Sequence, residues 1–388
     1  MAQLQKTYFD YSASTPVDPR VLDLMLPYFS EEYGNPSSTH EYGQRAETAV
    51  EHARAGIADH LGCRAEQIIF TSGGSESDNL ALRGIALSSL RTHGKNHILT
   101  TAVEHMAVAA TVNQLAERFG FEVEFLPVSK TGRVSAEEVA ARIRDETAIV
   151  SVIYANNEIG TTNPIAEIGA VCRENIIPFH SDALQAPLCL DLDVDRLSVD
   201  LLSIGAHKFY GPKGVGALFI RDRSVIEPLQ TGGEQEFGLR GGTLNVPLIV
   251  GMAAALDIAR DERREFTRRM AALRDRLVHS VLELVPDARL TGEPVERLPY
   301  HASFVFKHVD GNLLLNLLDS AGFACSSGSA CKTGSPAPSE VLLSIGISPA
   351  WALGSLRITL GRGTTEQDIE RFCDLLPETI SKARKLTA

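Results

Sequence analysis

Residues 203–214 read SIGAHKFYGPKG, and this stretch decides how the rest of the chain is interpreted. An apolar, strand-like segment leads directly into a loop rich in glycine and proline, and Lys208 follows a histidine at the junction. A lysine that forms a Schiff base must be held at a fixed point and partly desolvated, whereas surface lysines lie on flexible, solvated faces. A lysine at the end of a strand is by itself more often structural, so its interpretation depends on its neighbours in the fold.

Four further strand-like segments precede Lys208, and each leads into polar residues that could take part in binding or catalysis. The segments are residues 68–71, 98–101, 148–154 and 176–179, and they are followed by residues 72–76, Glu104 and His105, residues 156–158, and Asp182 with Gln185. Helical patterns lie between the segments, at residues 80–90 and 135–143. Short apolar runs that alternate with helices predict a mostly parallel sheet buried on both faces. Ligands bind such sheets beyond the carboxyl ends of the strands, so we expect these polar residues to share one site.

The same residue types match the needs of pyridoxal 5'-phosphate (PLP). Lys208 would carry the cofactor, and Asp182 would pair with its protonated pyridine nitrogen, because an opposite charge at contact distance raises such a pKa by ~1–3 units. Residues 72–75, SGGS, open a helix and offer free backbone N–H groups to a phosphate. We therefore expect PLP at this edge of the sheet.

Four more residues complete the expected cofactor site. His105 would stack on the ring and move protons, Asn157 and Gln185 would hydrogen-bond the ring hydroxyl oxygen, and His207 would reach the phosphate. Each has a structural alternative: SGGS can be an ordinary loop, His105 a satisfied residue at the edge of a cleft, and Asp182 a helix cap. Their joint occurrence favours the functional interpretation.

A second informative stretch is residues 325–336, CSSGSACKTGSP. It has no helical or alternating apolar period and reads as a loop. A cysteine exposed on a loop is unusual, because free cysteines are mostly buried. Lys332 would lower the thiol pKa of Cys331 and make it a nucleophile, whereas Cys325 still belongs to an apolar element. We prefer Cys331 as the reactive thiol, with an incidental loop cysteine as the alternative.

With these motifs together, the sequence resembles the cysteine desulfurases of the NifS/IscS group, which are PLP-dependent enzymes of the class V aminotransferase type. The motifs are residues 10–16, 34–38, 71–79, 104–105, 156–160, 182–185, 207–214, 240–243 and 326–331. They follow in the same order from residue 7 to about residue 372, nearly the whole chain. The series is specific, although no single motif is decisive.

The resemblance implies a role for each matching residue. Lys208 would hold the cofactor and remove the Cα proton of L-cysteine, with His105 assisting proton transfer. Asp182 would pair with the ring nitrogen, and Asn157 and Gln185 would contact the ring oxygen. Phosphate would be bound by Gly74, Ser75 and His207, together with Thr243 from the other subunit of a homodimer. Arg357 would bind the substrate carboxylate with help from Asn35, and Cys331 would attack the substrate sulfur, giving L-alanine and an enzyme persulfide.

The sequence also departs from the family pattern. Gly205 stands where the family often has a serine, which removes one hydroxyl donor to the phosphate. Glu234 replaces a usual glycine and Phe237 a usual arginine in a segment that we expect near the dimer interface. The given sequence closes with residues 382–388, so we expect no extended tail of the kind by which some members engage an iron–sulfur scaffold protein. The sulfur acceptor is therefore open among iron–sulfur cluster assembly, tRNA thiolation, cofactor synthesis and nucleic-acid sulfur modification.

The fold class that follows is α/β, a fold-type I PLP-dependent transferase with a mostly parallel central sheet of the seven-stranded type. The chain of 388 residues is long enough for a large and a small domain. We place the large PLP-binding domain at residues 15–258 and a smaller α+β domain at residues 1–14 and 259–388. A helix at residues 251–285 would join them, and residues 302–306 and 356–359 are strand candidates of the small domain.

Charge and cysteine usage exclude several other classes. A net charge of −12 argues against a direct nucleic-acid surface. The six cysteines have no Cys-x-x-Cys spacing, so neither a disulfide framework nor a metal site is expected. No apolar segment is long enough for a signal or a membrane span, which favours a cytoplasmic protein. The remaining alternatives are a related PLP enzyme, such as an aminotransferase or a selenocysteine lyase, and a non-catalytic sulfur-relay subunit that kept the fold.

Overall fold

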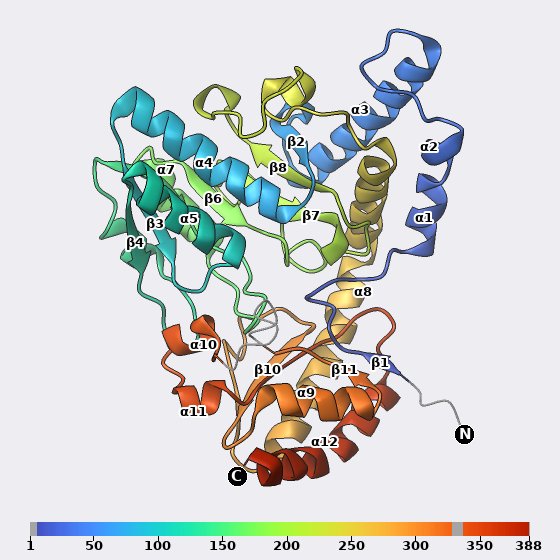
Figure 1. Cartoon of the computed structure of the whole chain (residues 1–388), viewed down its shortest axis with the longest axis vertical. Helices are drawn as coiled ribbons and strands as arrows, with labels where there is room; N and C mark the ends of the chain where they lie inside the picture. The colour runs from blue at the N-terminus through green and yellow to red at the C-terminus, as the bar shows by residue number, and fades with distance from the viewer. Residues whose placement is uncertain (1–5, 328–336, 388) are drawn as a thin grey trace.

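The structure is a computed structural model that describes residues 6–327 and 337–387. It contains two main sheets with a long helix, α8 (Val246–Leu284), that runs from one to the other (Figure 1). The larger sheet has seven strands in the order β2-β8-β7-β6-β5-β3-β4. Their bounds are β2 Ile68–Thr71, β3 His97–Thr101, β4 Glu122–Leu126, β5 Thr147–Ser151, β6 Phe179–Asp182, β7 Leu201–Gly205 and β8 Gly216–Ile220.

The larger sheet is mostly parallel, as the sequence predicted. Only β8 runs against its neighbours β2 and β7, while the pairs from β7 to β4 are all parallel. All strands except the edge strand β4 are completely buried, which explains why they read as continuous apolar runs. The predicted fold class is thereby confirmed.

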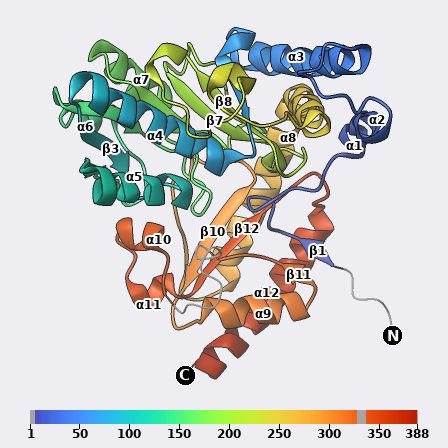
Figure 2. The ribbon, with the colours of Figure 1, turned by 45° about the horizontal axis from the view of Figure 1, so that its top comes forward.

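Helices cover both faces of this sheet, because successive strand residues point to opposite sides. Ile68 and Phe70 pack with α3 (Glu41–Leu61), α7 (Ile165–Glu174) and α8 on one side. Ile69 packs on the other side with α4 (Gly74–His93) and α5 (Met106–Phe119), which lie together over that face in Figure 2. The shorter helices α1 (Pro19–Met25), α2 (Pro27–Ser30) and α6 (Ala136–Ala140) complete this part.

The smaller sheet contains the antiparallel strands β9 (Ala288–Leu290), β10 (His301–Phe306) and β12 (Ser355–Thr359), with β10 in the middle. Beside it β1 (Thr7–Tyr8) pairs in parallel with β11 (Phe323–Ala324), so the N-terminal segment packs on the C-terminal part, as expected. The helices of this part are α9 Gly311–Ser320, α10 Glu340–Ser344, α11 Pro349–Ala352 and α12 Glu366–Thr387. The domain boundaries themselves stay predictions.

The structure corrects the strand predicted at residues 176–179. This segment is a connection, and the strand begins only at Phe179. Ile176 has a φ of 56° and is 87% exposed, and Pro178 has no N–H to donate to a sheet. The apolar residues Ile176 and Ile177 therefore mimic a strand that the backbone cannot form. Neither β4 nor β8 was predicted.

A buried ion pair explains what the unusual segment around Phe237 does. Arg54 donates to both carboxylate oxygens of Glu236, at 2.9 and 2.6 Å, and to the Ile68 carbonyl at 2.7 Å. Glu236 in turn accepts from the Phe70 N–H at 2.6 Å. The pair thus supplies hydrogen-bond partners to the outer edge of β2, which no other strand of the described residues covers. Phe237, in place of the family's arginine, lies under the Arg223 guanidinium at 3.9 Å.

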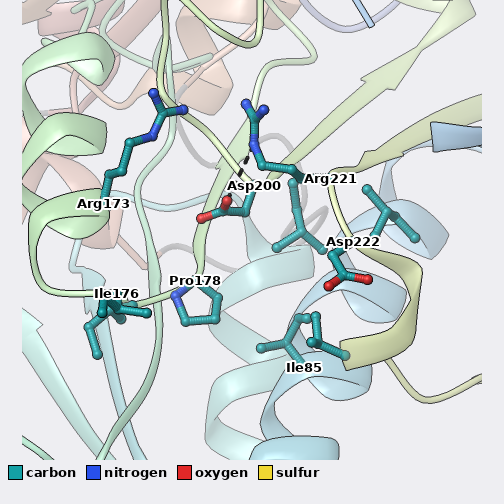
Figure 3. A pocket seen from close by; sticks show the side chains of 11 residues that line it. Ile85, Arg173, Ile176, Pro178, Asp200, Arg221 and Asp222 are labelled. Atoms are coloured by element: carbon teal, nitrogen blue, oxygen red, sulfur yellow. Dashed lines mark ion pairs between the residues drawn. The ribbon is translucent and has the colours of Figure 1, made fainter. Parts of the chain in front are cut away.

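The amino ends of the parallel strands form a pocket of about 380 Å³ (Figure 3). Its lining includes Ile85, Arg173, Ile176, Pro178, Asp200 and Arg221, and the last two form an ion pair at 3.4 Å. None of the predicted site residues lines this pocket, because they lie at the opposite, carboxyl end of the sheet. Among the described residues, no helix combines the length and the apolar character that a membrane crossing requires.

Candidate active site

Lys208 lies immediately beyond β7, in a single turn of 3-10 helix (Ala206–Lys208). Its Nζ donates to the carbonyl oxygens of Ser12 and Ala13, at 2.6 and 2.9 Å. The amine is therefore held by backbone groups of the N-terminal segment, not by a flexible solvated position. This is the fixed, partly desolvated setting that the sequence predicted for a Schiff-base lysine.

Asp182 ends β6, the strand beside β7, and is 3% exposed. Its Oδ1 accepts from the Leu184 N–H at 3.0 Å, so the carboxylate also shapes the following turn. Burial raises the pKa of Asp182, while the charges of His105 and Lys208 oppose that rise. A cationic ring nitrogen at this place would favour the carboxylate further, which fits the expected role.

His105 is the N-cap of α5, and its Nδ1 accepts from the Ala107 N–H at 3.1 Å. One ring nitrogen of His105, one carboxylate oxygen of Asp182 and one of Asp78 all lie within 4.8 Å of one another. Burial lowers the pKa of His105, so the neutral imidazole is favoured, with Nε2 carrying the proton. The residue can therefore donate at Nε2 and can exchange a proton there.

Gln185 and Lys208 share an acceptor, which shows that they are adjacent. Gln185 Nε2 donates to the Ser12 carbonyl at 3.0 Å, and its Oε1 accepts from the Tyr300 hydroxyl at 2.8 Å. Asn157 lies nearby in a turn whose geometry is fixed by its neighbour Asn156, which accepts from the N–H groups of residues 158 and 159. The Asn156 side chain is thus used to hold the turn, whereas the side-chain amide of Asn157 could hydrogen-bond a ligand.

The predicted phosphate cradle opens α4 at Gly74 and Ser75. Their N–H groups belong to the first turn, where no helical carbonyl can accept them. The close approach of β8 to this turn requires glycine at residue 216, because a Cβ there would lie 2.8 Å from the Gly73 backbone. A Cβ on Gly205 would lie at an ordinary contact distance of 3.4 Å from the Gly74 nitrogen, so a side chain would fit there, and the effect of this departure on phosphate binding stays a prediction.

His207 lies in the same turn as Lys208, and its Nδ1 is 3.4 Å from the Ser14 hydroxyl. Burial lowers the pKa of His207 to about 4, with further lowering by the charges of Lys208 and Lys213. A neutral histidine can donate one hydrogen bond to a phosphate.

Arg357 lies on β12 and is only 4% exposed, so it is not a surface arginine. Its Nη2 donates to Asp10 Oδ1 at 2.8 Å and its Nη1 to the Asn157 carbonyl at 3.0 Å. Its Nε has no hydrogen-bond partner within the described ranges. The guanidinium therefore joins the smaller sheet to the turn that carries Asn157, with donor capacity left for an anion.

Cys331 lies outside the described residues, but both ends of its loop are placed. Ser326, before the loop, exchanges two backbone hydrogen bonds with Arg357, at 2.7 and 3.2 Å. Ser339, after the loop, donates to Glu158 Oε2 at 2.6 Å. The described residues on either side of the Cys331 segment are therefore held by Arg357 and by Glu158, the neighbour of Asn157. By contrast, burial raises the pKa of the Cys325 thiol, which makes this cysteine a poor nucleophile.

Two predicted residues are not brought to this group by a described contact. Asn35 is exposed, and its Oδ1 accepts from the Ser37 N–H at 3.0 Å. Thr243 is exposed on the segment that leads into α8. Their roles stay predictions, and that of Thr243 requires a second subunit.

Sequence reasoning assigned no role to three side chains of the site. Tyr300 orients Gln185, and it has no motif around it that would signal this. Asp78 and Glu104 are completely or nearly buried carboxyls. Both stand within quoted motifs: Asp78 is an acid in the second turn of α4, and Glu104 precedes His105 in the turn after β3. Burial raises the pKa of Glu104 to about 8, although it accepts from the Ile153 N–H and the Thr101 hydroxyl.

The arrangement fits PLP on features of this structure. An amine, a buried carboxylate, an imidazole and a glycine-lined helix start lie at one edge of the sheet. A Cβ on Gly74 would lie 2.1 Å from the Leu184 side chain, so glycine lets this helix start pack closely against the turn that follows Asp182. Lys208 would hold the aldehyde carbon, Asp182 the ring nitrogen, and Gly74 with Ser75 the phosphate.

Comparison with known proteins gives the class of this chain. The sequence pattern of the family "Aminotransferase class-V" matches residues 7–372, and the chain belongs to this family.

Within the family, the chain is similar to proteins named as cysteine desulfurases. It is 46% identical over 380 residues to "Cysteine desulfurase IscS" of Methanosarcina thermophila, covering 98% of this chain and 93% of that protein. Among solved structures, a "NIFS-LIKE PROTEIN" superposes with a TM-score of 0.91 at 36% identity, covering 97% of this chain and 100% of the other. The structure "SspA in complex with cysteine" has a TM-score of 0.81 at 38% identity over 92% of this chain and 99% of that one. The predicted resemblance is confirmed.

Proposed function

We propose that this protein is a PLP-dependent cysteine desulfurase, which converts L-cysteine to L-alanine and transfers the sulfur to an enzyme cysteine as a persulfide. The observation that carries the proposal is the meeting of three parts that are far apart in the sequence. The Lys208 amine donates to the carbonyls of Ser12 and Ala13, and the Arg357 guanidinium donates to Asp10 of the same N-terminal segment. Ser326, which precedes the Cys331 segment, exchanges two backbone hydrogen bonds with Arg357. The cysteine complex of the similar SspA supports cysteine as the substrate.

The cofactor supplies an electron sink for the carbanion that forms at the substrate Cα. Lys208 is the base that takes the Cα proton, since its amine lies at a fixed point beside Asp182. His105 donates or accepts a proton at Nε2. Arg357 binds the substrate carboxylate and so orients the Cα–H bond toward Lys208.

Cys331 attacks the substrate sulfur as a thiolate. A sulfur–sulfur bond forms, the carbon–sulfur bond of the substrate breaks, and its electron pair stays on the carbon that becomes the methyl group of alanine after protonation. Lys332, next in the sequence, favours the thiolate form. The hydrogen bonds of Ser326 with Arg357 and of Ser339 with Glu158 support this role, because they hold the described residues on either side of Cys331 near Arg357.

The cellular setting is also part of the proposal. The enzyme acts as a homodimer in the cytoplasm, where Thr243 of one subunit completes the phosphate site of the other. The persulfide is passed to an acceptor protein. Iron–sulfur cluster assembly is one destination, and identification of the acceptor requires trapping of the persulfurated enzyme with candidate proteins.

The test is a product assay with PLP-loaded protein. L-cysteine with a reducing agent should give alanine and sulfide in equal amounts, together with a persulfide on the enzyme. A requirement for a keto-acid co-substrate would instead show an aminotransferase, and strong preference for selenocysteine would show a selenocysteine lyase. Protein that takes up no PLP would support a non-catalytic relay subunit.

Arg357→Lys tests the carboxylate site while keeping a positive charge beside Asp10. A lysine cannot reproduce the planar fork of donors, so one charge-assisted hydrogen bond to the substrate should be lost, and KM for cysteine should rise about 10-fold with a smaller effect on kcat. Steady-state kinetics measures this, and the unfolding temperature provides the control for an intact fold. An unchanged KM would remove Arg357 from the substrate site.

A further inference from the structure

Asp78 carries a second buried carboxyl, close to that of Asp182. It occupies the second turn of α4, its exposure is 0%, and neither of its oxygens has a hydrogen-bond partner within the described ranges. An oxygen of Asp78 lies within 4.8 Å of an oxygen of Asp182 and a nitrogen of His105. A buried carboxylate without partners is costly, so this group requires an explanation.

The groups that face Asp78 come from three strands and supply little positive charge. From β6, His180 Nε2 lies 3.6 Å from Asp78 Oδ1. That nitrogen is also 3.0 Å from the Ser203 hydroxyl on β7, and Nδ1 is 2.9 Å from the Ser151 hydroxyl. Burial lowers the pKa of His180 to about 3, so the ring is neutral. Glu104 and His105 follow β3, and Glu104 adds negative potential.

The two carboxyls have unequal surroundings. Asp182 accepts a backbone hydrogen bond from Leu184 and is attracted by His105 and Lys208. Burial and the negative charges of Asp182 and Glu104 raise the pKa of Asp78 well above the usual value. Only the Ser203 hydroxyl acts in the opposite direction and lowers this pKa. Two buried carboxyls at this separation resist double ionisation, and the proton goes to the one with the poorer donors.

We propose that Asp78 is a protonated, neutral acid and a positioning residue for Asp182. As a neutral acid it leaves Asp182 as the single anion of the pair, directed at the ring nitrogen of the cofactor. This inference rests on the proposed function only in that PLP occupies the site. An ionised Asp78 would add a second negative charge close to Asp182, and this charge would change the proton affinity of the bound cofactor.

Infrared spectroscopy of PLP-loaded protein at pH 7 tests where the proton is. The spectrum should contain a carboxylic-acid carbonyl band that disappears in Asp78→Asn. Glu104→Gln is the matched control, because it removes a separate buried acid and should leave the Asp78 band in place. Asp78→Ser, also neutral but smaller, serves the same test if the amide variant does not fold. A spectrum of Asp78→Asn that keeps every such band would overturn the proposal.

A pH titration of the cofactor's visible absorption gives a second readout. Asp78→Asn copies the neutral acid, so the spectroscopic pKa should stay within about 0.3 pH units of the wild-type value. If Asp78 were ionised, its replacement would remove a negative charge and lower that pKa by about one pH unit or more, which would contradict the proposal. Neither readout depends on turnover, so an inactive protein would speak against the desulfurase function without affecting the assignment of the proton.

Discussion

Lys208→Ala should yield a folded protein that does not turn over cysteine. Activity should fall by at least ~10³-fold, because the substitution removes both the amine that holds the cofactor and the base that takes the Cα proton. The bound PLP should also become separable by gel filtration, and the visible absorption of the purified protein should be lost. The assays are alanine formation and the absorption spectrum after desalting.

A matched control for this variant is available in the same loop. Lys213 is five residues further along and exposed, and it acts on the site only through the effect of its charge on the pKa of His207. Lys213→Ala should retain both colour and activity. The hydrogen bonds that Lys208 makes are to backbone carbonyls of Ser12 and Ala13, which water can satisfy in the variant, so the unfolding temperature should change little. An unchanged cofactor spectrum in Lys208→Ala would refute the assignment of this lysine.

The sequence predicts the sheet well where strands are completely buried. β2, β3, β5 and β7 read as apolar runs because helices cover both of their faces. The prediction failed at residues 176–179, where an exposed isoleucine and a proline imitate a strand. It also missed β8, because this antiparallel strand follows the Lys208 loop so closely that the glycines around it read as part of the loop. The apolar period and the composition of a segment indicate whether it is buried, but they do not show with which strand its backbone forms hydrogen bonds.

In the candidate site, too, some residues could be predicted from the local sequence and others could not. Lys208, Asp182 and His105 were predictable, because each follows a strand and parallel strands end at one edge. Tyr300, which orients Gln185 from 115 residues away, was not, because this contact depends on how the smaller sheet packs against the larger. Asp78 was visible in the sequence, yet its meaning depends on its distance from Asp182, which only the fold supplies.

Cys331→Ser should separate the chemistry of the cofactor from the transfer of sulfur. The variant should keep its bound PLP and its visible spectrum, because residues 326 and 339, which hold the loop, are unchanged. Persulfide formation should be lost and sulfide release from cysteine should fall by ~10²-fold or more, since a serine hydroxyl is not ionised near neutral pH and cannot form a sulfur–sulfur bond.

Cys325→Ser is the control that makes this test specific. Cys325 is six residues earlier and is a free cysteine, but burial raises the pKa of its thiol, so it should contribute nothing to sulfur transfer. The persulfide should therefore be found on residue 331 in Cys325→Ser and on neither residue in Cys331→Ser, as measured by mass spectrometry of alkylated peptides. Full sulfide release by Cys331→Ser would show that the substrate's carbon–sulfur bond is broken without this thiol. The enzyme would then release sulfide directly.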